Sequence, residues 1–129
     1  MSESEESRIG TMAWIDLTVD DAEGIRDFYK DVVGWEPSPV DMGEYSDFTM
    51  NIPGTDDPTA GICHKRGTNT GLPSCWMVYV TVASVERSAA RCRELGGEVL
   101  IGPKQMGQHG RYCVIRDPAG AVAALVEPA

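Results

Sequence analysis

The sequence predicts an α+β protein built from two βαβββ modules, whose curved mixed sheets surround a shared cavity. Three features lead to this prediction: a strand followed at once by an amphipathic helix, the return of that pattern in the second half, and short strands separated by turns. The expected domain covers residues 10–129, with module 1 at 10–64, a linker at 65–74 and module 2 at 75–128. Residues 1–9 are expected to form a disordered acidic tail.

The first module is defined by the stretch from Thr11 to Trp35. Apolar and polar residues alternate from Ala13 to Val19, as in a half-buried strand, which directs Asp16 away from the apolar face. Asp20 and Asp21 are natural N-cap residues for the helix that follows. Its apolar face is expected to consist of Ile25, Phe28, Tyr29 and Val32, with Gly34 ending the helix.

The other elements follow from alternation and turn residues. Further strands are expected at residues 35–39, 47–52, 59–64, 76–82, 98–101, 111–116 and 121–127. A second helix should start after Ser84 and run to about Leu95, where two glycines end it. Asp117, Pro118 and Gly120 occupy the positions that a type I turn prefers before the last strand.

The two halves are related by a constant offset in residue number, the one that separates Asp16 from Tyr79. A duplicated βαβββ unit is the simplest explanation of this repeat. The matched pairs are Asp16 and Tyr79, Thr18 and Thr81, Val19 and Val82, Glu23 and Glu86, Gly34 and Gly97, and His64 and Glu127.

The composition restricts the partners. The chain has 129 residues, 42% of them hydrophobic, and a net charge of −9, which argues against binding to nucleic acid or anionic membranes. The acidity is compatible with a cationic or metal-bound ligand, or simply with solubility. No apolar run reaches the roughly 18–20 residues that cross a bilayer, and the polar first residues do not resemble a signal peptide. The four cysteines form no C-x-x-C pair, so we expect free thiols in a cytoplasmic protein.

Four motifs together resemble the vicinal oxygen chelate superfamily, over about residues 10 to 128. They are W-x-D-L-x-V-x-D at Trp14, F-Y-x-x-V-x-G-W at Phe28, L-G-G-x-V at Leu95 and R-D-P-x-G…E-P at Arg116. This group includes glyoxalase I, bleomycin resistance proteins, fosfomycin-modifying transferases and extradiol dioxygenases. The resemblance supports the paired βαβββ fold more strongly than any one activity.

The resemblance also implies a site at the ends of the first and last strands of each module. Asp16, His64, Tyr79 and Glu127 occupy those positions. Asp16, His64 and Glu127 could hold a divalent metal such as Zn, Ni, Mn or Fe, or the site could contain none, because Tyr79 stands where a histidine is usual. Asp16 and Glu127 are the candidate catalytic carboxylates. From the residues alone, each could instead be a buried carboxylate satisfied by a protein donor.

Aromatic and sulfur-containing side chains could line the cavity and bind a flat organic ligand, or could simply fill the space between the sheets. These candidate ligand-binding residues are Trp14, Trp35, Met50, Met77 and Tyr79. The glycine-flanked loop around His109 could act as a lid, or could be an ordinary hairpin loop.

The expected function is the binding, with or without turnover, of a small organic molecule. If the protein is an enzyme, the resemblance implies metal-assisted chemistry of the lyase or dioxygenase type, in which a cation holds two vicinal substrate oxygens. The alternative is a non-catalytic protein of the bleomycin resistance type that sequesters a drug or metabolite. A homodimer is expected, in which module 1 of one chain faces module 2 of the other.

Overall fold

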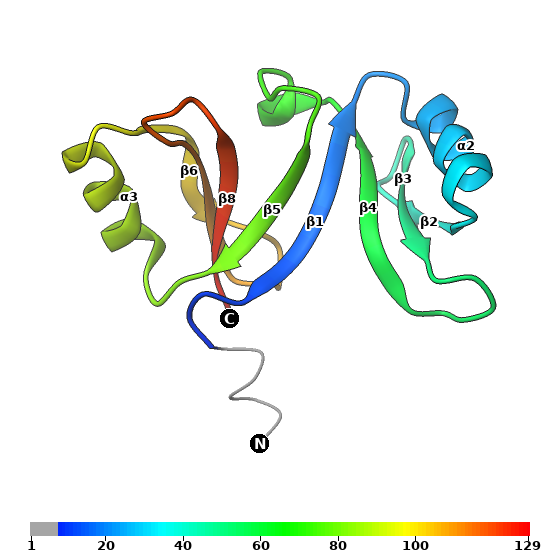
Figure 1. Cartoon of the computed structure of the whole chain (residues 1–129), viewed down its shortest axis with the longest axis horizontal. Coiled ribbons are helices and arrows are strands. Elements are labelled where there is room, and N and C mark those ends of the chain that lie inside the picture. The colour runs from blue at the N-terminus through cyan, green and yellow to red at the C-terminus, as the bar shows by residue number, and fades with distance from the viewer. Residues whose placement is uncertain (1–7) are drawn as a thin grey trace. The chain divides into compact units, whose positions relative to one another are not determined.

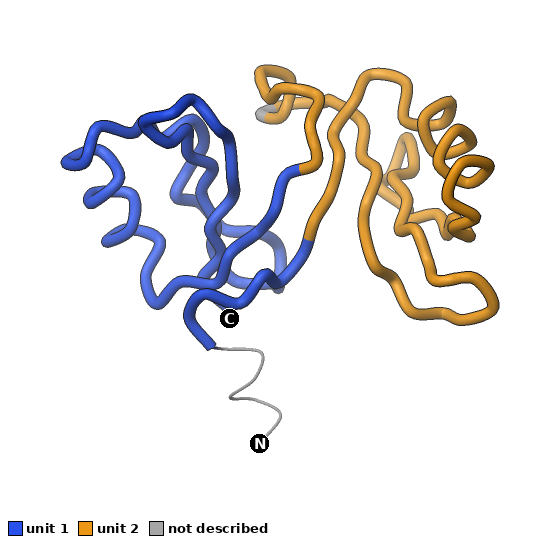
Figure 2. The backbone as a smooth tube through the Cα atoms, viewed as in Figure 1, with its two compact units in different colours: residues 1–14, 77–129 blue, residues 15–76 orange. Residues whose placement is uncertain are grey.

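The structure, a computed structural model, describes residues 8–129, so the expected tail lies outside the described residues except for Arg8 and Ile9. The chain divides into two compact units (Figure 2). Unit 2 consists of residues 15–76 and contains most of the expected module 1. Unit 1 consists of residues 77–129 together with the described residues up to 14.

Unit 2 is a four-stranded mixed sheet with one helix against it (Figure 1). Its strands follow the order β2-β3-β4-β1, in which β1 and β4 are parallel and the other neighbours are antiparallel. The elements are β1 (Met12–Val19), α2 (Ala22–Val33), β2 (Glu36–Asp41), β3 (Ser46–Asn51) and β4 (Pro58–His64), followed by the short 3-10 helix η1 (Gly67–Asn69).

Unit 1 repeats this arrangement with the strand order β5-β8-β7-β6. Strands β5 and β8 are parallel, and the remaining neighbours are antiparallel. The elements are β5 (Trp76–Thr81), α3 (Val85–Glu94), β6 (Glu98–Gln105), β7 (Arg111–Arg116) and β8 (Val122–Glu127). The predicted α+β fold with duplicated βαβββ topology is therefore confirmed.

The offset between the halves holds in the parallel strand pairs but changes elsewhere. Asp16 lies opposite Gly61 in unit 2, and Tyr79 lies opposite Ala124 in unit 1, so both partners are shifted by the same amount. On the next strand Phe48 and Cys113 are equivalent, because they lie opposite Ile62 and Leu125 respectively. The offset there is two residues longer, so the segment before β7 contains two more residues than the corresponding segment of unit 2.

Both helices begin with the expected caps. The Asp21 carboxylate accepts a hydrogen bond from Gly24 N–H at 3.0 Å, and the Ser84 hydroxyl accepts one from Arg87 N–H at 3.2 Å. The helix ends differ: Gly34 takes the left-handed conformation with φ 92°, whereas the left-handed residue after α3 is Gly96 with φ 96°. The expected equivalence of Gly34 with Gly97 is therefore wrong by one residue, because α3 is shorter than α2.

The core of each unit lies between its sheet and its helix. In unit 2, Ile25 and Tyr29 of α2 pack against a buried cluster, but Phe28 and Val32 are 53% and 64% exposed. Only half of the predicted apolar face of this helix is therefore buried, because only one edge of that face packs against the sheet. The core residues of unit 2 are Leu17, Val19, Ala22, Phe48, Met50 and Ile62, and those of unit 1 are Val85, Ala89 and Cys113 with Val82, Val99, Ile115 and Leu125 around them.

Strand β6 is longer than the sequence suggested. It continues through Gly102 and Pro103 to Gln105, with irregular register on both sides of Ile101. The strand was expected to end at Ile101, whereas Gly102 and Pro103 occupy an irregular segment within it. In the described part of the chain, neither helix has the length and apolar character needed to cross a membrane.

Candidate functional site

Each sheet has one face against its helix and one face turned away from it, which we call the helix-free face. In unit 1, Cys113 and Leu125 belong to the helix-side core, so the alternating neighbours point to the helix-free face. Strand pairing arranges these neighbours in two rows. One row is Tyr79, Ala124, Val114 and Ile101, and the other is Thr81, Val126, Tyr112 and Lys104.

The helix-free face of unit 1 is mainly apolar at its centre. Val114 and Ala124 are fully buried, and Met77, two residues before Tyr79 on β5, is 4% exposed. Tyr79 and Tyr112 add aromatic rings with hydroxyl groups to this face, and Lys104 adds an ammonium at the end of its row. The partly exposed side chains of Tyr79, Tyr112 and Lys104 can contact a flat organic molecule, whereas Val114 and Ala124 lie beneath the accessible surface.

The helix-free face of unit 2 is polar instead. Asp16 lies beside Gly61, Thr18 lies beside Cys63, and Thr49 continues the first row on β3. Asp16 and Thr18 are buried, at 8% and 6% exposure. The prediction that Asp16 points away from the helix-side core is confirmed, since Leu17 and Val19 belong to that core.

The pKa of the Cys63 thiol reflects the environment of this polar face. Burial raises the pKa of Cys63 strongly, and the nearby charges of Asp16 and Asp47 raise it further. A thiol in these surroundings stays protonated at neutral pH and is a poor nucleophile. Cys63 can therefore contribute shape and a weak S–H donor to the face, but not thiolate chemistry.

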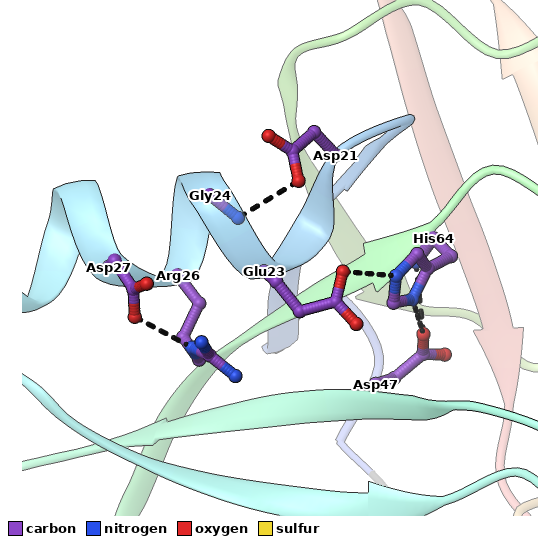
Figure 3. A network of polar contacts seen from close by, with 7 residues as sticks. All are labelled: Asp21, Glu23, Gly24, Arg26, Asp27, Asp47 and His64. Atoms are coloured by element: carbon purple, nitrogen blue, oxygen red, sulfur yellow. Dashed lines mark hydrogen bonds and ion pairs between the residues drawn. The ribbon is translucent and has the colours of Figure 1, made fainter.

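His64 lies on the helix side, between two carboxylates (Figure 3). Its Nε2 is 3.3 Å from Glu23 Oε1 on α2, and its Nδ1 is 3.2 Å from Asp47 Oδ1 on β3. The same Asp47 oxygen accepts the backbone N–H of His64 at 2.9 Å. The ring of Tyr45 meets the imidazole edge-on, with centroids 5.3 Å apart. His64 thus connects β4 to β3 and to the first turn of α2.

Glu127 occupies the matching place at the end of β8. Its Oε1 accepts the backbone N–H of Val85, the first residue of α3, at 3.0 Å. Its neighbour across the sheet is Arg111, whose guanidinium donates to Glu86 in the first turn of α3. The carboxylate that the sequence left unexplained therefore caps a helix N-terminus, where backbone donors and the helix dipole favour negative charge.

The four predicted site positions fall on different faces of their sheets. Asp16 and Tyr79, from the first strands, are on the helix-free faces, whereas His64 and Glu127, from the last strands, contact the helices. Among residues 8–129 no group of three or more His, Cys, Asp or Glu side chains is placed to hold a metal ion. The residues present therefore do not fit a metal centre that includes both Asp16 and His64.

The candidate ligand-binding residues also lie in different parts of the two units. Met50 is fully buried in the helix-side core of unit 2, and Trp35 packs against that core. The ring of Trp35 contacts those of Tyr29 and Trp76, and Trp76 Nε1 donates to Tyr29 Oη at 3.1 Å. Met77 and Tyr79 remain on the helix-free face of unit 1.

Two further candidates remain. Trp14 is partly buried and lies two residues before Asp16 on β1, so alternation places it on the same side of the strand as Asp16. His109 is exposed in the turn after β6, where its backbone N–H donates to Met106 O at 2.9 Å. This hydrogen bond closes the hairpin turn between β6 and β7. Such a bond is typical of an ordinary hairpin loop, which the sequence analysis gave as the alternative to a lid.

Three residues of the helix-free face of unit 1 were not predicted from the sequence. Tyr112 alternates with Cys113 on β7 and could have been assigned by the rule that placed Tyr79. Lys104 could not, because β6 was expected to end at Ile101. Thr81 was seen only as a repeat partner of Thr18, but its hydroxyl oxygen is buried without a hydrogen-bond partner in the described part of the chain.

A sequence profile of the Glyoxalase/Bleomycin resistance protein/Dioxygenase superfamily matches residues 11–125. The chain belongs to this superfamily. Two curated relatives are a "Putative glyoxylase CFP32" of Mycobacterium tuberculosis, 30% identical over 120 residues, and an "Anthracycline biosynthesis protein DnrV" of Streptomyces peucetius, 30% identical over 127 residues. The alignments cover 93% and 90% of this chain but only 45% and 46% of the relatives, so the chain spans about half their length.

Solved structures of other proteins share the fold. A variant of methylmalonyl-CoA epimerase from Streptomyces coelicolor in complex with 2-nitronate-propionyl-CoA has a TM-score of 0.59 and 18% identity, covering 94% of this chain and 96% of that one. A variant of homoprotocatechuate 2,3-dioxygenase from B. fuscum in complex with HPCA has a TM-score of 0.57 and 20% identity, covering 93% of this chain and 32% of that one. At these identities the likeness concerns the fold.

Proposed function

We propose that this superfamily member binds a small organic molecule, with the helix-free face of unit 1 supplying the apolar and aromatic contacts. The observation that carries the proposal is the combination of a buried apolar centre, Val114 and Ala124, with Tyr79 and Tyr112 in adjoining rows. Aromatic side chains contribute large contact areas, and their hydroxyls orient polar groups of a ligand.

The comparisons support a small molecule without naming it. One relative is described as an anthracycline biosynthesis protein and another as a putative glyoxylase, while the epimerase and dioxygenase structures contain organic ligands. Because this chain spans about half of those relatives, their activities are proposals here. A polycyclic aromatic compound suits the unit 1 face best, since that face offers rings and aliphatic groups rather than a cluster of charges.

A binding assay tests the proposal directly. We would add quinizarin, a dihydroxyanthraquinone, or methylmalonyl-CoA to the purified chain and follow tryptophan fluorescence and melting temperature. Saturating ligand should raise the melting temperature because it binds the folded state alone. Tyr112→Leu should weaken quinizarin binding by roughly tenfold, the size expected for a lost aromatic contact. Tyr45→Leu, which alters unit 2 at the contact with His64, is the matched control and should bind as wild type.

Two further arms separate a binding protein from an enzyme. Turnover of a glyoxalase or catechol substrate by the protein as purified would establish catalysis, with metal content measured in the same sample. Saturable binding without turnover would support the sequestering alternative. If no probe binds the wild type at its solubility limit, the proposal fails for these ligand classes.

We also propose that the protein is a homodimer in the cytoplasm, as βαβββ sheets with a helix on only one face gain from a second sheet. Light scattering at micromolar concentration measures the mass. A monomeric mass there would contradict the dimer and leave the binding proposal standing.

A further inference from the structure

Thr81, at the end of β5, has a buried hydroxyl that makes no hydrogen bond to any side chain or backbone group in the described part of the chain. The residue is 1% exposed, and Oγ1 has no hydrogen-bond partner within residues 8–129. Its backbone is satisfied, because its N–H donates to Thr11 O at 2.9 Å and its carbonyl accepts from Gly10 N–H at 2.8 Å. The hydroxyl alone is left over. Buried hydroxyls almost always find a partner, and leaving one unpaired destabilises the folded state.

Among the described residues, the neighbours of this hydroxyl are apolar. The neighbouring positions on the same segment are valines, Val80 and Val82, and Thr81 pairs with Val126 on β8. Valine has nearly the shape of threonine and would fit an apolar strand without an unpaired polar atom. A requirement other than the stability of the unliganded fold therefore favours threonine here.

The position of the side chain indicates that requirement. Thr81 lies on the helix-free face, in one row with Val126, Tyr112 and Lys104, and two residues after Tyr79. Polar atoms on this row border the apolar centre of the face. Because the hydroxyl is covered in the free protein, a ligand oxygen reaches it only when a neighbouring side chain of the face moves aside, and the hydroxyl then donates one hydrogen bond to that oxygen.

We propose that the Thr81 hydroxyl is a specificity-determining subsite, which donates a hydrogen bond to a carbonyl oxygen of a planar aromatic ligand on the helix-free face of unit 1. The inference rests on the proposed binding function and adds the group that the ligand must carry. Binding gives a partner to a donor that has none among the described residues, so a ligand with the oxygen gains over the same ring system without it.

Two variants test the state of the hydroxyl in the free protein. Thr81→Val removes an unpaired polar atom and should raise the melting temperature by roughly 2–4 °C. Thr55→Val is the matched control, because the Thr55 hydroxyl donates to Ile52 O at 2.8 Å and accepts from Asp57 N–H at 3.0 Å. The control should lower the melting temperature. An unchanged or lowered value for Thr81→Val would show that the hydroxyl is already paired, by water or protein, and would overturn the inference.

Ligand discrimination tests the subsite itself. Wild type should bind quinizarin about tenfold more tightly than anthracene, its ring system without oxygens, and Thr81→Val should lose that preference while binding anthracene as before. Thr81→Ser, which keeps the hydroxyl, should retain the preference. Equal quinizarin affinity in wild type and Thr81→Val overturns the subsite and leaves the proposed function intact. A wild type that binds neither compound overturns both.

Discussion

The carboxylate of Glu127 and the backbone N–H of Val85 are 3.0 Å apart and join the last residue of β8 to the first residue of α3. In unit 2 the corresponding place belongs to His64, which contacts Glu23 in the first turn of α2. Both units therefore connect the end of a strand to the start of their helix, unit 1 through a carboxylate that accepts a backbone N–H and unit 2 through a histidine that contacts a carboxylate. His64 and Glu127 thus have an organising role on the side of each sheet that faces the helix.

Glu127 should contribute to stability through this contact. Glu127→Gln keeps an acceptor but loses the charge that favours a helix N-terminus, and should lower the free energy of unfolding by about 0.5–1 kcal/mol. Glu127→Ala leaves the Val85 N–H without its acceptor and should lose about 1–2 kcal/mol. Urea unfolding measures both. Glu44→Gln, in an exposed turn, is the control.

A metal arm accompanies this experiment. Added Zn²⁺ should change neither the melting temperature of wild type nor that of Glu127→Gln. The described residues contain no group of three or more His, Cys, Asp or Glu side chains placed to hold a metal ion. A rise in wild type that Glu127→Gln abolishes would instead restore Glu127 as a metal ligand.

His64 and Asp47 should be energetically coupled. Asp47 contacts both the backbone N–H and the ring of His64, and both side chains are largely buried, at 14% and 13% exposure. A double-mutant cycle with His64→Ala and Asp47→Ala should give a coupling of about 1–2 kcal/mol. The exposed pair Arg91 and Glu94, at 2.6 Å on α3, should give less than about 0.5 kcal/mol. Equal couplings for the two pairs would show that His64 is only a surface contact.

Much of the fold could be read from the sequence because its signals are local. Alternation predicted the direction of Asp16, and Asp21 and Ser84 were recognised as caps. The constant offset between the halves predicted the equivalent registers of β1 with β4 and of β5 with β8. These features depend on a few neighbouring residues whose preferences agree with the tertiary structure.

The candidate site was harder to predict because it depends on which face of a strand a residue occupies near the strand end. His64 and Glu127 lie one residue beyond Cys63 and Val126, and a shift of one residue moves a side chain to the other face. Lys104 was missed because the irregular segment at Gly102 hid the rest of β6. Such irregularities arise from pairing with a distant strand, which a local pattern does not report.

Cysteine labelling should follow burial rather than sequence order. Burial raises the pKa of the fully buried Cys113 to about 11, and the pKa of Cys63 is also raised. At pH 8, iodoacetamide should therefore modify the partly exposed Cys75 well before either of them, as peptide mass spectrometry would show. Fast labelling of Cys63 at pH 8 would contradict the assignment of its thiol to the buried polar face.

The same shift sets the sign of a pH effect on stability. Since the folded state holds the Cys113 proton more tightly, its contribution is complete below the ordinary pKa of 9.0 and is lost as pH rises through about 11. Cys113→Val should therefore show a shallower fall of unfolding free energy than wild type across that interval. Identical slopes would indicate that the thiol titrates normally.

The free edge of unit 2 should resist strand addition. Strand β2 ends the order β2-β3-β4-β1, and Pro37 and Pro39 lie opposite Met50 and Phe48. A proline has no N–H, so it is tolerated where the nitrogen points away from the neighbouring strand, which here is the edge. The edge therefore lacks two donors that an incoming strand would need.

Replacing both prolines should create a competent edge. Pro37→Thr combined with Pro39→Thr restores two outward N–H groups and should raise the mass measured by light scattering as concentration increases, beyond any wild-type dimer. Ser38→Thr, between them on the same strand, keeps both prolines and is the control. The double variant also loses about 1–2 kcal/mol of stability through a more flexible unfolded chain, so the measurement belongs well below its melting temperature. A double variant that keeps the wild-type mass at every concentration would mean that β2 is protected by something other than its prolines.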